Sequence, residues 1–265
     1  MKVITLIENR VSLAHLVAEH GLSFYIETAN AKVLFDTGAS ENFAHNAKLL
    51  GVDISQVDAL VLSHGHNDHT GGLAYFIENN NKAKIYLKEE ASWPKFKNDR
   101  FIGMSHRINT ENPRFIWVKD TLEVVDGIFI VPSIHPYFEA DQHKDFFYTQ
   151  KDNLKIADLF SDELFLVLKT EKGVSIVSSC SHNGITNMVE TAKNYFKQPV
   201  LDVIGGFHIK DDKNEITDQL AQFFNQSEIR RIFTGHCTGV EKFAQIQTKC
   251  LAPVFYNETG QVIEI

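Results

Sequence analysis

The chain has 265 residues, 43% of them apolar and 11% aromatic, which is ample for a buried core. Its net charge of −8 argues against a nucleic-acid groove or an anionic membrane surface as the main partner. No apolar run approaches the roughly 20 residues of a membrane span, and three cysteines are too few for a disulfide framework. We therefore expect a cytoplasmic protein, and a homo-oligomer is compatible with the sequence.

Strand and helix patterns are interspersed along the chain. Short apolar or alternating runs predict strands at residues 3–7, 22–27, 32–35, 57–62, 83–87, 115–118, 127–131, 164–169, 174–178, 200–204, 231–234, 254–256 and 262–265. Amphipathic spacing predicts helices at residues 41–50, 72–79, 186–196 and 215–224. Hairpins dominate the first 40 residues, and no glycine-rich nucleotide loop follows the first strand. We therefore expect two sheets packed face to face with helices outside, rather than a doubly wound parallel sheet.

Two stretches of the expected single domain, residues 1–265, fit no regular element. Residues 89–112 are polar, rich in Lys and Arg and weakly periodic, which suggests an excursion from the core. Residues 137–148 combine aromatic and charged side chains, as binding loops often do. We expect the second stretch to form a flap with a ring against the substrate, the candidates being Phe146, Phe147 and Tyr148. The alternative is a loop that buries these rings in the core.

The most informative stretch is residues 63–72, directly after the predicted strand at 57–62. It contains three histidines and one aspartate within six positions, namely His64, His66, Asp68 and His69. Imidazole and carboxylate groups are the usual ligands of a divalent ion such as zinc. A strand end followed by a tight loop can direct several side chains to one point. The pattern therefore predicts a metal site.

Three later turns place a histidine just beyond an apolar strand and near a glycine. These histidines are His182, His208 and His236. One such histidine alone is more often a hydrogen-bonded edge residue, but three of them together with the first cluster predict metal binding. Cys180 is either a thiolate ligand or a buried structural residue, and we interpret Cys237 and Cys250 as structural.

Two charged residues near these motifs have less direct roles. Asp36 follows the third predicted strand. It could bind the metal, but we favour a carboxylate that orients a ligand histidine and stiffens the turn, with a simple turn residue as the alternative. Lys210 could contact an anionic substrate group, although a solvated surface lysine is the simpler interpretation.

The turn Asp36-Thr37-Gly38 and the stretch 63–72 resemble the metallo-β-lactamase superfamily. The resemblance implies an αβ/βα four-layer sandwich with a metal site at one sheet edge. It also implies that His64 and His66 bind a first ion and that Asp68 and His69 bind a second. The remaining protein ligands would be His182, His208 and His236. Two Zn²⁺ ions are the expected cofactor, with Fe, Mn or Mg as alternatives.

Four further segments, at 19–23, 180–182, 205–208 and 234–239, resemble one branch of the superfamily. That branch comprises metal-dependent hydrolases and includes the archaeal dihydropterin–ribofuranosylaminobenzene-phosphate synthases. It implies hydrolysis of a small anionic ester, lactone or phosphoester by metal-activated water, with Asp68 as a ligand and a catalytic group. The alternatives are a transferase of the synthase type and a non-catalytic metal-binding protein. A di-iron oxidoreductase is disfavoured because His66 stands where that branch has glutamate.

Overall fold

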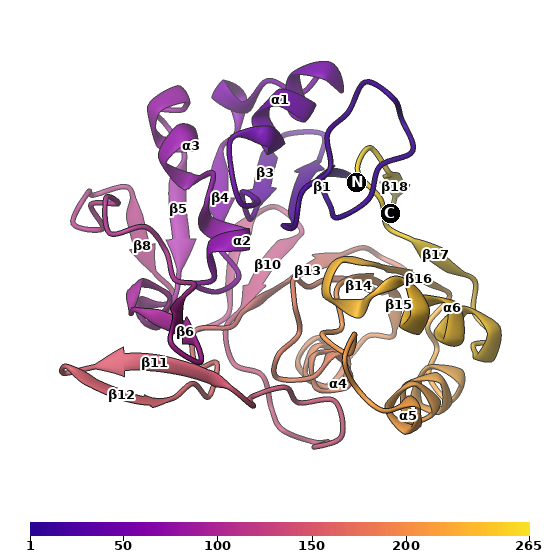
Figure 1. Cartoon of the computed structure of the whole chain (residues 1–265). Coiled ribbons are helices and arrows are strands. Elements are labelled where there is room, and N and C mark those ends of the chain that lie inside the picture. The colour runs from indigo at the N-terminus through magenta and orange to yellow at the C-terminus, as the bar shows by residue number, and fades with distance from the viewer. The chain divides into compact units, whose positions relative to one another are not determined.

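The structure is a computed structural model that describes residues 1–265, and it divides into two compact units. The first unit consists of Met1–Lys119, Lys144–Leu164 and Glu258–Ile265, and the second of Asp120–His143 and Phe165–Asn257. Each unit has its own seven-stranded sheet and its own apolar core (Figure 1). None of the helices combines the length and apolar character that crossing a membrane requires.

A seven-stranded mixed sheet with the order β18-β1-β2-β3-β4-β5-β8 forms the centre of the first unit. Its strands are β1 (Lys2–Ile7), β2 (Ser23–Glu27), β3 (Lys32–Phe35), β4 (Ala59–Val61), β5 (Lys84–Leu87), β8 (Phe115–Trp117) and β18 (Val262–Glu264). Strands β18, β1, β2 and β3 pair antiparallel, whereas β3, β4, β5 and β8 pair parallel. Because β3 and β4 are parallel neighbours, the turns that follow them lie at the same sheet edge. Those turns carry Asp36 and His64.

The helices α1 (Asn42–Leu49) and α3 (Leu73–Asn79) cover one face of this sheet (Figure 1). Each places apolar side chains three or four positions apart, so that one stripe faces the sheet. Phe43 of α1 and Phe76 of α3 are fully buried in this core. The short helices η1 (Ile54–Gln56) and α2 (Asn67–Thr70) complete the connections around β4.

A second, four-stranded sheet in the first unit has the order β12-β11-β6-β7. It consists of β6 (Lys95–Lys97), β7 (Arg100–Phe101), β11 (Phe147–Lys151) and β12 (Leu154–Ala157), and η2 (Glu89–Ser92) precedes it. The stretches at 89–112 and 137–148 are therefore partly regular, although residues 137–146 contain no helix or strand. Asp152 and Asn153 turn the β11–β12 hairpin with positive φ angles of 49° and 62°, a conformation that Asp and Asn tolerate well.

The second unit has a mixed sheet with the order β17-β16-β15-β14-β13-β10-β9. Its strands are β9 (Leu122–Val125), β10 (Ile128–Val131), β13 (Phe165–Lys169), β14 (Val174–Val177), β15 (Val200–Gly205), β16 (Arg231–Thr234) and β17 (Val254–Tyr256). Strands β9, β10, β13 and β14 pair antiparallel, and β14 to β17 pair parallel. The helices α4 (Ile185–Phe196), α5 (Asn214–Asn225) and α6 (Val240–Lys249) pack against its apolar core, and η3 (His236–Thr238) precedes α6.

Every predicted strand and helix is present, with ends that differ by at most two residues. The sequence analysis missed α6, in which only two side chains, those of Lys242 and Ile246, are buried. It also missed the strands β6, β7, β9 and β11, as well as β12, whose residues are all exposed. α6 does space Val240, Phe243 and Ala244 at helical intervals, so its pattern was overlooked, whereas β12 is only four residues long and buries none of them.

Candidate metal centre

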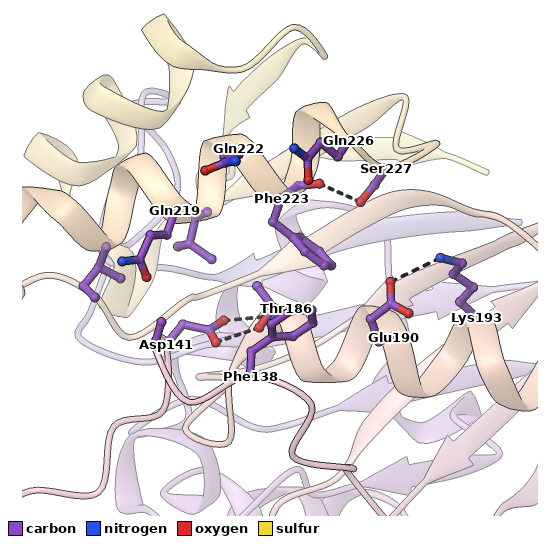
Figure 2. Close-up of a pocket in the computed structure, with 13 residues that line it drawn as sticks. Phe138, Asp141, Thr186, Glu190, Lys193, Gln219, Gln222, Phe223, Gln226 and Ser227 are labelled. Carbon is purple, nitrogen blue, oxygen red and sulfur yellow. Dashed lines mark hydrogen bonds and ion pairs between the residues drawn. The ribbon is translucent and has the colours of Figure 1, made fainter.

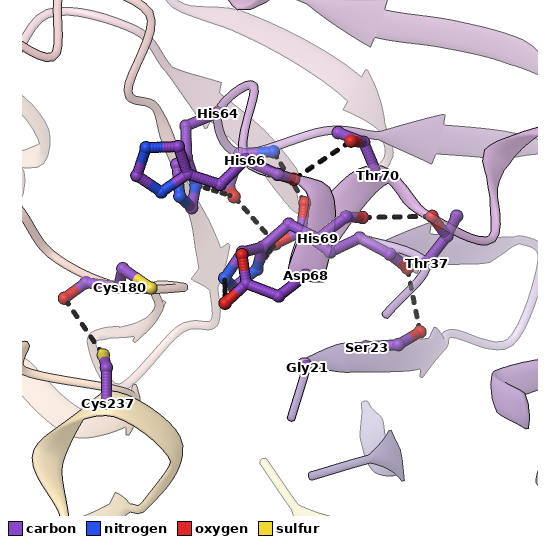
Figure 3. A network of polar contacts seen from close by, with 12 residues as sticks. Gly21, Ser23, Thr37, His64, His66, Asp68, His69, Thr70, Cys180 and Cys237 are labelled. Atoms are coloured by element: carbon purple, nitrogen blue, oxygen red, sulfur yellow. Dashed lines mark hydrogen bonds and ion pairs between the residues drawn. The ribbon is translucent and has the colours of Figure 1, made fainter. Parts of the chain in front are cut away.

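The first unit gathers the histidines of the stretch 63–72 in one place (Figure 3). The His64 ring lies 4.6 Å from the His66 ring and 4.4 Å from the His69 ring, centroid to centroid. All three side chains are buried. On the single-turn helix α2, the Oδ2 atom of Asp68 lies 3.6 Å from Nε2 of His69. The loop after β4 therefore brings together the four ligands predicted from this stretch.

Asp36 holds both the start of this loop and one of its histidines. Its Oδ1 atom accepts a hydrogen bond from the Ser63 amide at 2.7 Å. Its Oδ2 atom accepts from the Ser63 hydroxyl at 2.7 Å and from Nδ1 of His69 at 2.9 Å. A histidine that donates through Nδ1 presents the lone pair of Nε2, which is the arrangement that orients a metal-binding imidazole. Asp36 itself has a φ of 60° and is 1% exposed.

We expect Asp36→Asn to weaken metal binding by about 10- to 100-fold. Asparagine keeps an acceptor for the Ser63 amide but presents an NH₂ donor where Nδ1 of His69 needs an acceptor. The measurement is a competition titration against a chelator, with circular dichroism to verify folding. Asp58→Asn, which removes a half-exposed carboxylate that pairs with Lys82 in the same unit, is the matched control. Equal affinities in the two variants would contradict the orienting role.

A buried cluster of three charged residues holds the backbone of the same loop at Gly65. The Lys95 ammonium lies 2.9 Å from Asp158 Oδ2 and 2.9 Å from Asp162 Oδ1. The other oxygen of Asp162 accepts a hydrogen bond from the Gly65 amide at 2.8 Å. Burial alone would lower the pKa of Lys95, but the charges of Asp162 and Asp158 outweigh it and raise that pKa. Gly65 also needs to be glycine, because a Cβ there would lie 2.3 Å from the Ala91 carbonyl oxygen.

Aromatic rings enclose His66. Phe147, at the start of β11, stacks on the His66 ring at 5.3 Å, and Phe160 meets it edge-on at 5.6 Å. Burial lowers the pKa of His66 to about 3, so the ring is neutral at physiological pH, as a metal ligand must be. Of the other two rings predicted to contact the substrate, Phe146 is 65% exposed and Tyr148 lies beneath the Lys155 ammonium.

The second unit places the later motifs at one edge of its sheet, because β14, β15 and β16 are parallel and each ends in one of them. The ligand atoms of Cys180, His182 and His208 all lie within 4.8 Å of one another. The same holds for Cys180, His236 and Cys237. His208 and His236 adopt positive φ angles of 52° and 50°, which turn the chain sharply after the strands.

Cys237 belongs to this cluster, although the sequence suggested a structural role. Its thiol points to the Cys180 carbonyl oxygen at 3.6 Å (Figure 3). Burial alone would raise the pKa of Cys237, but hydrogen bonds with Cys180 and His208 and the charges of His236 and His208 lower it well below its usual range. The sequence could have indicated Cys237 as a ligand candidate, because it directly follows His236, which is one. A thiolate is a soft ligand that suits zinc.

The sequence analysis also missed two histidines beside these clusters. His20 lies 3.3 Å from Asp68, measured from Nε2 to Oδ2. His143 donates its amide to the His182 carbonyl oxygen at 2.9 Å, and His182 donates Nδ1 to the His143 carbonyl oxygen at 3.4 Å. Lys210, which we interpreted more simply as a solvated surface lysine than as a substrate contact, is exposed. The imidazoles and carboxylate of the first unit, and the imidazoles and thiols of the second, are donors that fit a borderline divalent cation such as zinc.

A model of the metallo-β-lactamase superfamily matches residues 16–145. The 7,8-dihydropterin-6-methyl-4-(β-D-ribofuranosyl)-aminobenzene-5′-phosphate synthase of Methanocaldococcus jannaschii is 33% identical over 240 residues, which cover 84% of this chain and 82% of the synthase. The chain belongs to the metallo-β-lactamase superfamily. An uncharacterised protein of the same archaeon is 28% identical over 99% of this chain and 100% of its own length.

The structure agrees with this membership of the superfamily. Tm1679, a metal-dependent hydrolase of the β-lactamase superfamily, matches with a TM-score of 0.90 and 26% identity, over 100% of this chain and 99% of Tm1679. The fold class predicted from the motifs is therefore confirmed as the metallo-β-lactamase fold, with two mixed sheets and accompanying helices. The similarity to the synthase also confirms the predicted branch.

Proposed function

We propose that the protein is a metal-dependent hydrolase that uses activated water to cleave a small anionic ester, lactone or phosphoester. The observation that carries the proposal is the convergence of buried donors at the ends of parallel strands in each unit. The similarity to Tm1679, a metal-dependent hydrolase, supports it. The anionic character of the substrate is inferred from the branch of the superfamily.

The ligands that we assign to the metal are the predicted ones, with zinc as the first choice and Fe, Mn or Mg as alternatives. They are His64, His66, Asp68, His69, His182, His208 and His236. When bound, a divalent cation lowers the pKa of a coordinated water towards neutrality and stabilises negative charge in the transition state. The protein's own part is to hold the imidazoles neutral and oriented, as Asp36 does for His69 and burial does for His66.

Asp68 is the group that we assign to proton transfer. Its side chain is 17% exposed, so a carboxylate oxygen can contact solvent while the rest is held in the loop. The Oδ2 atom lies 3.3 Å from His20 and 3.6 Å from His69. A carboxylate in this position can orient the attacking water and take up its proton.

The test begins with protein purified without added metal or a His tag. Elemental analysis is expected to find about two ions per chain, the number that the superfamily resemblance implies. The double variant His64→Ala/His69→Ala is expected to lose them, whereas His15→Ala/His45→Ala, which changes two exposed histidines of the same unit, keeps them. The loaded protein should hydrolyse members of a panel of esters, lactones and phosphodiesters. Chelation should abolish turnover, and adding the metal back should restore it.

Fully loaded protein that hydrolyses nothing in the panel would contradict the hydrolase assignment. The second candidate, a transferase, is favoured by the 33% identity to the archaeal synthase. In that reaction an aryl acceptor attacks a pterin methylene and pyrophosphate leaves. Incubation with a dihydropterin pyrophosphate and an aminobenzene acceptor would give a coupled product together with pyrophosphate in a transferase. A hydrolase would give no coupled product, whether or not it cleaves the pyrophosphate ester.

A further inference from the structure

A cavity of about 450 Å³ lies in the second unit between α4 and α5 (Figure 2). Residues 138–141 close one side of it. Its volume is within the range of roughly 300–1,000 Å³ that is typical of small-molecule sites. None of the residues that line it is a ligand candidate of the metal centre.

The cavity has an apolar, aromatic wall. Phe223 of α5 and Phe138 face each other edge-on, with ring centroids 5.4 Å apart. Leu220, one helical turn before Phe223, is 1% exposed, and Ile216 extends the same stripe by another turn. Phe138 is 41% exposed, so part of this aromatic surface faces solvent. A planar apolar group would bury area here that is otherwise in contact with water.

The polar groups of the cavity carry more negative than positive charge. Glu190 and Lys193 of α4 form an ion pair at 3.3 Å, so their charges offset each other. The Asp141 carboxylate is 1% exposed and accepts two hydrogen bonds from Thr186, from the amide at 2.9 Å and from the hydroxyl at 2.7 Å. No lysine or arginine forms an ion pair with it. Burial raises the pKa of Asp141, although the hydrogen bonds from Thr186 and the charge of His143 oppose this shift.

We propose that this cavity binds a small arylalkylammonium ligand, with the aromatic ring against Phe138 and Phe223 and the ammonium group towards Asp141. The ring would contact the apolar wall, and the ammonium would place a full positive charge near a buried carboxylate that has no lysine or arginine as an ion-pair partner. The proposal concerns a site separate from the metal centre and does not depend on the reaction assigned there.

The segment between Phe138 and His143 connects this cavity to the backbone of His182. Asn187 of α4 holds Phe138 through two hydrogen bonds of 2.8 Å, one to its amide and one to its carbonyl group. Five residues later, the His143 amide donates to the His182 carbonyl oxygen. A ligand that contacts both Phe138 and Asp141 would therefore restrain the segment that ends at this hydrogen bond.

The proposal is tested by calorimetric titration of the full chain with 2-phenylethylammonium, the neutral analogue 2-phenylethanol and the anion 3-phenylpropionate. We expect saturable 1:1 binding of the ammonium, at least tenfold weaker binding of the alcohol and no binding of the anion. Equal binding of all three compounds, preference for the anion, or no binding of the ammonium would overturn the proposal.

Two variants locate the site. Phe223→Ala removes part of the aromatic wall, and Gln219→Trp fills the cavity from an exposed position of α5 that tolerates a large side chain. Both are expected to weaken binding of the ammonium at least tenfold. Phe129→Ala is the matched control, because Phe129 is a partly buried ring that packs on Phe196 outside the cavity. Unchanged affinity in Gln219→Trp, or an equal loss in Phe129→Ala, would refute the location.

Hydrogen exchange tests the connection to His182. The ligand is expected to slow exchange of the His143 amide at least threefold and to leave the amides of β1, in the other unit, unchanged. Binding without slower exchange at His143 would show that the connecting segment does not respond, and would overturn this part of the proposal.

Discussion

Lys95→Met is expected to lower the free energy of unfolding by about 3–5 kcal/mol, the usual cost of removing one partner from a buried charge cluster. The ammonium of Lys95 is the cation that contacts both Asp158 and Asp162, which are almost completely buried. Without it, two carboxylates remain next to each other in a medium of low polarity. Their repulsion and lost hydration both favour the unfolded chain.

Urea unfolding monitored by circular dichroism measures this effect. The control Lys155→Met removes a lysine whose partner, Asp99, is fully exposed, and it is expected to change stability little. The triple variant Lys95→Met/Asp158→Asn/Asp162→Asn removes all three charges and should regain most of the lost stability. A Lys95→Met protein as stable as the control would show that the two carboxylates do not destabilise the folded state when Lys95 is absent.

Lowering the pH should reduce the loss of unfolding free energy that Lys95→Met causes. Burial and the neighbouring Asp162 already raise the pKa of Asp158, although Lys95 opposes them. Without Lys95 that pKa rises further. A carboxylate whose pKa is higher in the folded state than in the unfolded state costs stability at neutral pH, and the cost disappears as protonation proceeds. The stability difference from wild type should therefore narrow as the pH falls from 7, and a constant difference would contradict the electrostatic explanation.

Asp68→Asn is expected to lower kcat by about 10²- to 10⁴-fold at saturating metal, the range for loss of a general acid–base group. The amide keeps the size of the side chain and one oxygen, but it cannot take up a proton. The variant should also lose the acidic limb of the pH–rate profile, which a residue with a purely structural role would leave in place. Elemental analysis of the assayed sample shows whether the metal is still bound.

Asp68→Glu is the matched control for this prediction, because it keeps a carboxylate and displaces it by one methylene. It should recover part of the rate and the acidic limb of the profile. An Asp68→Asn protein with full metal content and full turnover would eliminate the catalytic role. A loss of metal in proportion to the loss of rate would reduce Asp68 to a ligand only.

The sequence was most informative where the necessary residues are contiguous. The stretch 63–72 contains four candidate ligands in six positions, and the later histidines each follow an apolar strand, so both features appear as local patterns. Parallel pairing of β14, β15 and β16 then brings the later motifs to one edge, as the strand pattern suggested. Local patterns of this kind are the ones that sequence interpretation detects.

The groups that support these ligands could not be predicted in this way. Asp162 contacts the Gly65 amide across 97 residues of sequence, and Lys95 contacts Asp158 across 63. A buried lysine is chemically unusual, and nothing in the residues around Lys95 distinguishes it from the exposed lysines of the same polar stretch. The contact between the Cys237 thiol and the Cys180 carbonyl oxygen likewise depends on how the turns after β14 and β16 meet, rather than on sequence spacing.

The first unit is assembled from three separate parts of the chain, and this has a consequence for its synthesis. During synthesis, the Gly65 amide of the metal loop has no Asp162 carboxylate to bind until residue 162 has left the ribosome. Likewise, β1 lacks its outer neighbour until residues 262–264 of β18 have emerged. Because β18 lies far from β1 along the chain, one edge of β1 stays unpaired while the residues between the two strands are made. We therefore expect the nascent chain to depend on chaperones that shield unpaired strands, and to acquire its metal only after all three parts of the first unit have been made.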